Sequence, residues 1–245
     1  MTQSHTGSAL LRTVDNLRGP AGRLEALLNA GAPGAPYAAL VCHPHPLGGG
    51  TMHNKVVYQA MKAFQGFGLP VLRFNFRGTE LSAGEHDHGE GEQDDVRAAL
   101  GWLKREFELP ILFAGFSFGS FVGLRACCGD ARVVGLVALG LPTRAEGRDY
   151  RYDFLRECVQ PKLFVSGTRD QYGPVAGVEA AVALAREPKE LVWISDADHF
   201  FAAAPSLAAA GAVGARDKSA GSKLEDVKQA IRAWAQCYFP VLSSQ

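Results

Sequence analysis

The chain has 245 residues, of which 47% are hydrophobic and 20% are charged, so it can bury the core of one globular domain. Its 25 lysines and arginines balance its 25 aspartates and glutamates, and this argues against a nucleic-acid partner, which normally requires a basic surface. No apolar run approaches the ~20 residues of a membrane span, and residues 1–8 lack the apolar stretch of a signal peptide. We therefore expect one cytoplasmic domain over residues 1–245 without a membrane partner, and the sequence leaves the oligomeric state open.

The order of apolar runs predicts an α/β fold. Residues 9–30 carry short apolar stretches around Gly19-Pro20-Ala21-Gly22, which favours an antiparallel hairpin at a sheet edge. The further expected strands cover residues 37–42, 70–75, 111–114, 133–139, 162–165 and 191–194. The expected helices cover residues 54–67, 96–107, 117–127, 175–185 and 224–238, and Ser222 with Glu225 predicts a capping box before the last one.

Alternation of buried strands and amphipathic helices is typical of a mostly parallel, doubly wound sheet with helices on both faces. The N-terminal hairpin would add an antiparallel edge. Ligands of such sheets bind beyond the carboxyl ends of the strands, so the residues that follow each strand are the candidates for function.

Gly115-Phe116-Ser117-Phe118-Gly119 follows the strand predicted at 111–114 and precedes a predicted helix. This G-x-S-x-G pattern is typical of a sharp turn that presents a nucleophilic serine, with glycines where two backbones pass too closely for a Cβ. The helix N-terminus would favour the negative charge that develops in acyl transfer. Ser117 is therefore the candidate nucleophile.

A serine nucleophile needs a base, and the base needs an orienting acid. Asp170 and His199 each follow a predicted strand, in the chain order Ser, acid, His. Asp196 and Asp198 compete for the acid role, but they share a loop with His199 and would reach its far nitrogen with difficulty. We expect a triad of Ser117, Asp170 and His199.

The oxyanion of an acyl-transfer intermediate needs two backbone N–H donors. Phe118, which follows the nucleophile, is expected to supply one, and the loop of residues 43–50 to supply the other. Pro44 and Pro46 have no N–H, which leaves His45 or Leu47, and we favour His45. Phe116, Tyr172 and Phe200 lie beside the catalytic positions and suggest an apolar substrate pocket, although core packing explains some of them equally well.

Other polar residues are interpreted without a role in catalysis. His43, His45 and His53 could bind a metal, but no acidic or cysteine cluster accompanies them, so neither a metal nor another cofactor is expected. The acidic run from Glu85 to Asp95 is interpreted as a solvated loop that runs into a helix N-terminus, and His86 and His88 are expected to be solvated there.

The five cysteines are interpreted as buried free thiols in a reducing compartment, because their number is odd and no pair has zinc-site spacing. They are Cys42, Cys127, Cys128, Cys158 and Cys237. Cys42 is a poor rival nucleophile because it ends a buried strand and lacks a helix N-terminus that would lower its pKa.

The chain also resembles a known family, the small lidless bacterial α/β-hydrolases related to dienelactone hydrolase. The motifs that carry the resemblance are His43-Pro44-His45-Pro46, Gly48–Gly50, Asn54-Lys55-Val56-Val57, Arg73-Phe74-Asn75-Phe76-Arg77-Gly78 and Gly115-Phe116-Ser117-Phe118-Gly119. The resemblance implies a Ser117-Asp170-His199 triad and the hydrolysis of short-chain esters.

Two segments depart from the pattern of that family. Glu80 stands where the family has a second glycine, in R-G-x-G-x-S, so the turn must differ or tolerate strain. The Ala/Gly-rich stretch 201–221 is long, and we favour a loop over a flap that covers the site.

We therefore expect a serine hydrolase that cleaves small carboxylic esters through an acyl-enzyme. A thioesterase or small-peptide hydrolase with the same triad, and a non-catalytic binding protein on this scaffold, are the alternatives. A complete triad argues against the last, because binding proteins on this scaffold normally carry a damaged one.

Overall fold

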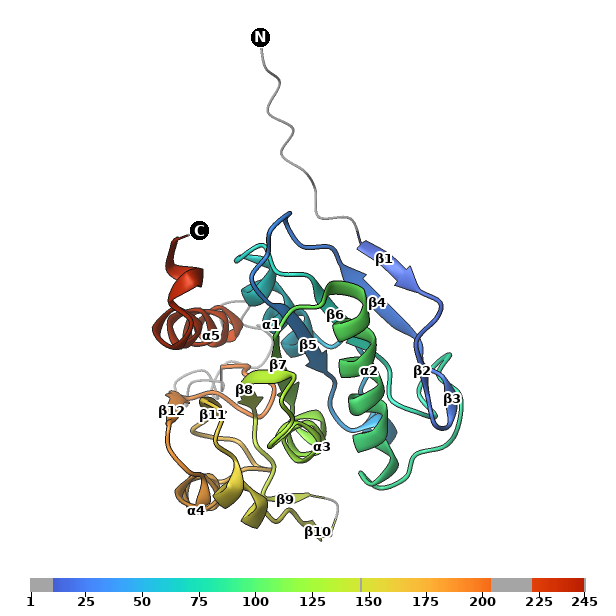
Figure 1. Cartoon of the computed structure of the whole chain (residues 1–245). Helices are drawn as coiled ribbons and strands as arrows, with labels where there is room; N and C mark the ends of the chain where they lie inside the picture. Colours follow the sequence, from blue (N-terminus) through green and yellow to red (C-terminus); the bar gives the residue numbers. More distant parts are fainter. Residues whose placement is uncertain (1–10, 146, 204–221, 245) are drawn as a thin grey trace, which may run out of the picture.

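The computed structural model describes residues 11–145, 147–203 and 222–244 (Figure 1). Its main sheet has eight strands in the order β1-β4-β6-β5-β7-β8-β11-β12. These strands are β1 (Leu11–Val14), β4 (Ala26–Asn29), β6 (Val71–Phe74), β5 (Ala38–Cys42), β7 (Ile111–Phe116), β8 (Val133–Leu139), β11 (Lys162–Gly167) and β12 (Lys189–Ile194). Within this sheet, β6, β5, β7, β8, β11 and β12 run parallel to one another. At one edge, β4 pairs antiparallel with β6, and β1 pairs antiparallel with β4.

The predicted N-terminal hairpin is confirmed. Leu11 of β1 pairs with Asn29 of β4 in antiparallel register. A small ribbon of β2 (Arg18–Gly19) and β3 (Gly22–Arg23) forms where the glycines were expected to break the run.

Helices cover both faces of the sheet, as Figure 1 shows. They are α1 (Lys55–Gln65), α2 (Gly91–Phe107), α3 (Phe118–Cys127), α4 (Val175–Leu184) and α5 (Leu224–Tyr238), with short 3-10 helices η1 (Pro46–Gly48), η2 (Asp153–Glu157) and η4 (Pro240–Ser244). The apolar side chains of α2, α3 and α4 bury one face, and those of α1 and α5 bury the other. The fully buried strands β5, β6 and β7 correspond to the continuous apolar runs of the sequence.

No lid domain occurs among the described residues. The connection from β8 to β11, where this fold usually inserts a lid, contains only the ribbon of β9 (Arg144–Ala145) and β10 (Arg148–Asp149) and the 3-10 helix η2. Most of the stretch at 201–221, where a loop was favoured over a flap, lies outside the described residues.

The predicted capping box is wrong in one half. Ser222 Oγ does accept the Leu224 N–H at 3.3 Å, but the helix α5 is capped by Lys223. The Glu225 carboxylate instead lies along the helix surface, 2.7 Å from Lys228 Nζ. Because Glu225 is one position closer to the cap than a capping box requires, it finds its partner within the helix.

The cysteine prediction is wrong for one pair. Cys128, at the end of α3, forms a disulfide with Cys158, at the end of η2. Cys42 and Cys127 are buried free thiols and Cys237 is an exposed one. Spacing along the chain could not reveal the pair, because only the packing of η2 beside α3 brings these two residues together. The expectation of a cytoplasmic location stays a prediction, and these two cysteines no longer support it.

Candidate active site

Ser117 occupies the tight turn between β7 and α3. Its backbone is strained, with φ 55° and ψ −122°, a conformation that L-residues rarely adopt. The flanking glycines lie where two backbones pass too closely for a Cβ, as predicted. A Cβ at Gly115 would lie 2.4 Å from the Gly119 carbonyl oxygen, and a Cβ at Gly119 would lie 2.3 Å from the His43 carbonyl oxygen. Close packing of β7, α3 and the loop after β5 therefore forces the half-buried serine into its strained conformation.

His199 and Asp170 meet Ser117 at the carboxyl ends of the strands. Nε2 of His199 lies 2.8 Å from Ser117 Oγ, and its Nδ1 lies 2.7 Å from Asp170 Oδ2. The second carboxylate oxygen of Asp170 accepts the backbone N–H groups of Tyr172 and Gly173 at 2.8 and 3.0 Å. Asp170 is buried and can accept only, so Nδ1 of His199 carries the proton and Nε2 is left to accept the serine hydroxyl.

The two rival aspartates have other partners. Asp196 is exposed and pairs with Arg169 at 2.9 Å. Asp198 Oδ1 accepts the N–H groups of Phe200 and Ala202, both at 2.9 Å, and so shapes the turn that follows His199. The two ring nitrogens of His199 face Asp170 and Ser117 instead.

His43 holds the loop after β5 in place. Its Nδ1–H donates to the Pro44 carbonyl at 2.7 Å, and its Nε2 accepts the Phe76 N–H at 2.9 Å. Burial lowers the pKa of His43 from 6.5 to about 4, so the ring is neutral at pH 7. Because both nitrogens are used within the protein, His43 cannot also bind a metal.

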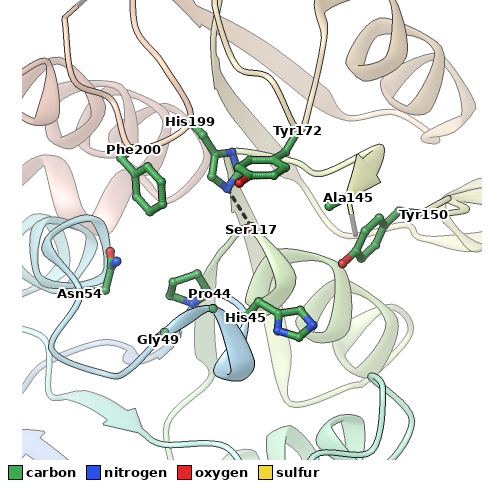
Figure 2. Close-up of a pocket in the computed structure, with 12 residues that line it drawn as sticks. Pro44, His45, Gly49, Asn54, Ser117, Ala145, Tyr150, Tyr172, His199 and Phe200 are labelled. Carbon is green, nitrogen blue, oxygen red and sulfur yellow. Dashed lines mark hydrogen bonds between the residues drawn. The ribbon is translucent and has the colours of Figure 1, made fainter. Parts of the chain in front are cut away.

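A cavity of about 210 Å³ opens above Ser117. Its lining residues are Pro44, His45, Gly48, Gly49, Gly50, Asn54, Ser117, Ala145, Tyr150, Tyr172, His199 and Phe200. Figure 2 shows Phe200 and Asn54 on one side of Ser117, and Ala145 and Tyr150 on the other. No lysine, arginine, aspartate or glutamate is among the described residues that line it.

Two of the three predicted pocket residues are in place. Tyr172 and Phe200 line the cavity, and the ring of Tyr172 lies 4.8 Å from that of His199. Phe116 does not line it: it is fully buried and packs behind His199 with its centroid at 5.0 Å. Ala145 and Tyr150 were not predicted, because β9, which carries Ala145, and the residue after β10 belong to a segment without a periodic signal.

The side chains of the two predicted oxyanion donors pack against each other. The rings of His45 and Phe118 are 4.8 Å apart, and His45 lines the cavity. The choice of the His45 N–H over that of Leu47 stays a prediction.

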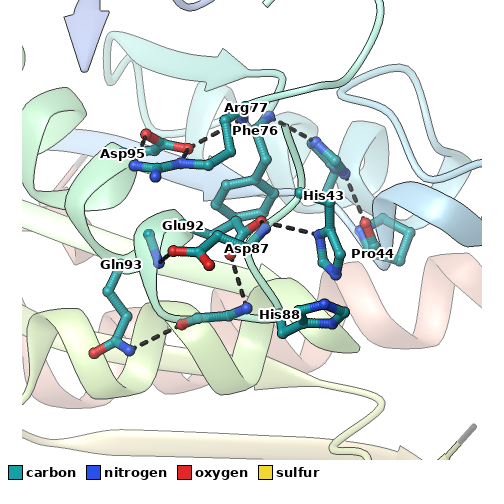
Figure 3. A network of polar contacts seen from close by, with 12 residues as sticks. His43, Pro44, Phe76, Arg77, Asp87, His88, Glu92, Gln93 and Asp95 are labelled. Atoms are coloured by element: carbon teal, nitrogen blue, oxygen red, sulfur yellow. Dashed lines mark hydrogen bonds and ion pairs between the residues drawn. The ribbon is translucent and has the colours of Figure 1, made fainter. Parts of the chain in front are cut away.

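The acidic run 85–95 is an exposed loop that runs into the N-terminus of α2, as predicted, but the acidic residues within α2 are not all solvated. Glu92 and Asp95 are fully buried, and Asp95 pairs with Arg77 through both of its oxygens (Figure 3). Nδ1 of His86 lies 2.9 Å from Glu92 and the His86 side chain is 7% exposed, whereas His88 is exposed. Alternating acidic and glycine residues resemble a surface loop in sequence, and nothing local indicates which of them are buried.

The turn that departs from the family pattern keeps the conformation of glycine. Glu80 has φ 49°, in the left-handed region that costs roughly 1–2 kcal/mol for an L-residue. Ser82, which matches the pattern, accepts the Glu25 N–H at 2.9 Å and donates to the Asn75 carbonyl at 2.7 Å. The turn therefore tolerates strain rather than adopting a different path.

Comparisons with known proteins support the geometry. A family model described as an alpha/beta hydrolase domain matches residues 38–229. An uncharacterized protein of Rickettsia prowazekii, RP471, is 36% identical over 191 residues, which are 75% of this chain and 79% of that protein.

Two solved structures extend the likeness over nearly the whole chain. An alpha-beta serine hydrolase homologue from Coxiella burnetii is 30% identical with a TM-score of 0.74, over 94% of this chain and 99% of that one. XC6422 from Xanthomonas campestris, described as an a/b serine hydrolase without lid, is 30% identical with a TM-score of 0.76, over 96% of this chain and 97% of that one.

No helix in the described ranges is long and apolar enough to cross a membrane. The fold, the nucleophile turn and these relatives agree with one another, and with the resemblance found in the sequence motifs. The chain belongs to the alpha/beta hydrolase family and groups with its small serine hydrolases that lack a lid.

Proposed function

We propose that the protein hydrolyses small, uncharged carboxylic esters through an acyl-enzyme on Ser117. The observation that carries the proposal is the continuous hydrogen-bonded chain from Asp170 through His199 to Ser117, with the serine facing a cavity. Its order and geometry fit the nucleophile, base and orienting acid of acyl transfer.

In the acylation step, Ser117 Oγ attacks the ester carbonyl carbon while its proton passes to Nε2 of His199. The carbonyl π bond opens to an oxyanion, which the Phe118 and His45 N–H groups would stabilise. When the carbonyl re-forms, the bond to the alcohol oxygen breaks, and the alcohol leaves with the proton from Nε2. Asp170 keeps its charge and stabilises the imidazolium in between.

In the deacylation step, water takes the place of the alcohol. His199 accepts a proton from the water as the water attacks the acyl carbon, and returns a proton to Ser117 Oγ as the acid departs. The cycle consumes one ester and one water and yields one acid and one alcohol, so it needs no cofactor.

The substrate class follows from the described lining of the cavity. The cavity of about 210 Å³ offers aromatic and glycine surfaces and no ammonium, guanidinium or carboxylate group. A phosphorylated or ionised substrate would therefore lose its hydration without gaining an ionic partner there. Uncharged acyl and alcohol groups fit the site best.

The triad would serve a thioesterase or a small-peptide hydrolase equally well, whereas a non-catalytic binding protein would have no use for it. The first test is labelling by a fluorophosphonate probe, which reacts only with an activated serine. We expect labelling of the wild type, none of Ser117→Ala, and full labelling of the control Ser195→Ala, which removes an exposed serine near the site.

Ester turnover should fall on the order of 10⁶-fold in Ser117→Ala while the melting temperature stays unchanged. Matched oxygen esters and thioesters of the same acid then identify the substrate class. Retained turnover in Ser117→Ala would contradict the mechanism, and a higher kcat/KM for thioesters would replace the ester assignment.

A further inference from the structure

A buried contact between a histidine and a carboxylate, which the mechanism does not use, lies beside the site. Nδ1 of His86 is 2.9 Å from Oε1 of Glu92, and the two side chains are 7% and 0% exposed. His86 belongs to the segment between β6 and α2, and Glu92 lies at the start of α2. A carboxylate and an imidazole are costly to bury, so their placement needs a reason beyond the filling of space.

Glu92 is fixed by its surroundings. Its two oxygens accept the backbone N–H groups of Asp87 and Gly89, each at 2.7 Å, as Figure 3 shows. It also lies in the first turn of α2, where the helix dipole favours a negative charge. The carboxylate is thus an immobile anchor, and His86 is its third partner.

The anchored imidazole packs against both residues that we propose as oxyanion donors. Its centroid lies 4.8 Å from that of His45 and 5.5 Å from that of Phe118. Each of the three rings therefore contacts the other two, because the ring centroids of His45 and Phe118 are themselves 4.8 Å apart. The backbone of the same segment adds support, since a Cβ on Gly89 would lie 3.5 Å from the Phe118 ring.

We propose that His86, held by Glu92, is a positioning residue for the oxyanion hole. It does not line the cavity above Ser117, so it acts through His45 and Phe118, whose rings it keeps in place. Donors to an oxyanion are effective only when they are already oriented before the reaction, and losing one costs about 10²–10³ in kcat. A supporting ring should have a smaller effect of the same kind. This inference rests on the proposed function.

The decisive variant is His86→Phe, which keeps a planar ring but removes the ring nitrogen that lies 2.9 Å from Glu92. We expect kcat to fall about tenfold with KM within about twofold, because the oxyanion exists only in the transition state. Glu92→Gln should have the same effect. The amide nitrogen of glutamine can only donate, so one of the two backbone N–H groups that Glu92 accepts would lose its partner. The control is His88→Phe: His88 is exposed and lies 5.1 Å from His86, one ring farther out, so kcat should stay unchanged.

The double variant tests whether the two residues act as one unit. If His86 acts through its pairing with Glu92, the double variant should lose no more kcat than either single variant. The Ki of a trifluoromethyl ketone, whose adduct with the serine carries the oxyanion, should rise by the same factor as kcat/KM falls. All assays are run at least 15 °C below the lowest melting temperature, so that unfolding does not contribute.

Three results would overturn the inference: a kcat of His86→Phe within twofold of wild type, a rise in KM at constant kcat, or losses that multiply in the double variant. A wild-type protein that a fluorophosphonate does not label at Ser117 would overturn the proposed function, and this inference with it. Normal labelling together with an unchanged His86→Phe would overturn the positioning role alone.

Discussion

The two oxygens of Asp170 have different partners. Oδ2 faces His199, while Oδ1 accepts the N–H groups of Tyr172 and Gly173 and so fixes the carboxylate in one orientation. The orientation of the imidazole is therefore set by the backbone of the loop after β11. The strongest consequences of single substitutions should appear here and at His43.

Asp170→Asn should leave the protein folded and lower kcat by roughly 10⁴, because the amide would favour the wrong tautomer of His199. Steady-state kinetics on a short ester measure the loss, and circular dichroism verifies folding. Asp196→Asn is the matched control, since its exposed carboxylate pairs with Arg169. A greater loss in Asp196→Asn or Asp198→Asn would show that the acid is misassigned.

His43 should make the folded state sensitive to acid. Its pKa falls from 6.5 to about 4 on burial, so below pH 6.5 the unfolded chain binds a proton that the folded protein does not. The stability that a neutral His43 contributes is complete above pH 6.5 and is lost progressively as the pH falls to 4. At about 1.36 kcal/mol per pH unit, the loss approaches about 3 kcal/mol.

Urea unfolding at pH 7.5 and pH 5 measures this effect. His43→Gln should be less stable at pH 7.5 but should show a smaller drop towards pH 5 than the wild type. His53→Gln, which removes an exposed histidine, should keep the full drop. Equal pH dependence in wild type and His43→Gln would mean that His43 is not the group that titrates.

At the scale of elements, the site is assembled from loops that short helices and ribbons hold together. The ribbon β9–β10 supplies Ala145, and Tyr150 directly follows it. The 3-10 helix η2 comes next in the chain and is joined to the end of α3 by the disulfide Cys128–Cys158. The nucleophile helix and the wall of the cavity are thus linked by a covalent bond outside the site.

Loss of that disulfide should lower stability and leave chemistry intact. The cross-link spans 30 residues of sequence, and closing a loop of that length in the unfolded chain is worth roughly 3–4 kcal/mol. Cys128→Ser should therefore melt at a lower temperature, with unchanged kcat at 20 °C. Thermal melts with and without dithiothreitol, together with thiol counting by mass spectrometry, make the measurement. Cys237→Ser is the control, and an identical melt for Cys128→Ser would show that the pair does not form in solution.

At the scale of the whole molecule, helices protect both faces of the sheet, while the edge at the carboxyl ends of its strands remains open in the described residues. None of the residues that the structure describes forms a lid over the cavity there, and Phe200 on its rim is 49% exposed. An open cleft gives an extended substrate little apolar surface beyond the pocket itself. The length of the acyl chain should therefore limit binding.

We expect kcat/KM to peak at short acyl chains and then to level off or fall. A fully buried CH₂ contributes about 0.8 kcal/mol, close to fourfold in kcat/KM, and this gain stops once the cavity is full. A series of p-nitrophenyl esters of increasing length measures the profile. A steady rise to long chains would contradict the open site, and the same series after deletion of residues 204–221 would tell whether that segment supplies the missing cover.

The sequence by itself determined the fold class, the nucleophile turn and the order of Ser117, Asp170 and His199. These features depend on local patterns: apolar periodicity, glycines at close approaches, and polar residues placed just after strands. Only the tertiary structure decided which cysteines pair, that Phe116 lies behind the site, and that His86 and Glu92 are buried beside it. Those outcomes depend on contacts between segments far apart in the chain. The identity of a residue does not show whether water or another segment of the chain surrounds it after folding.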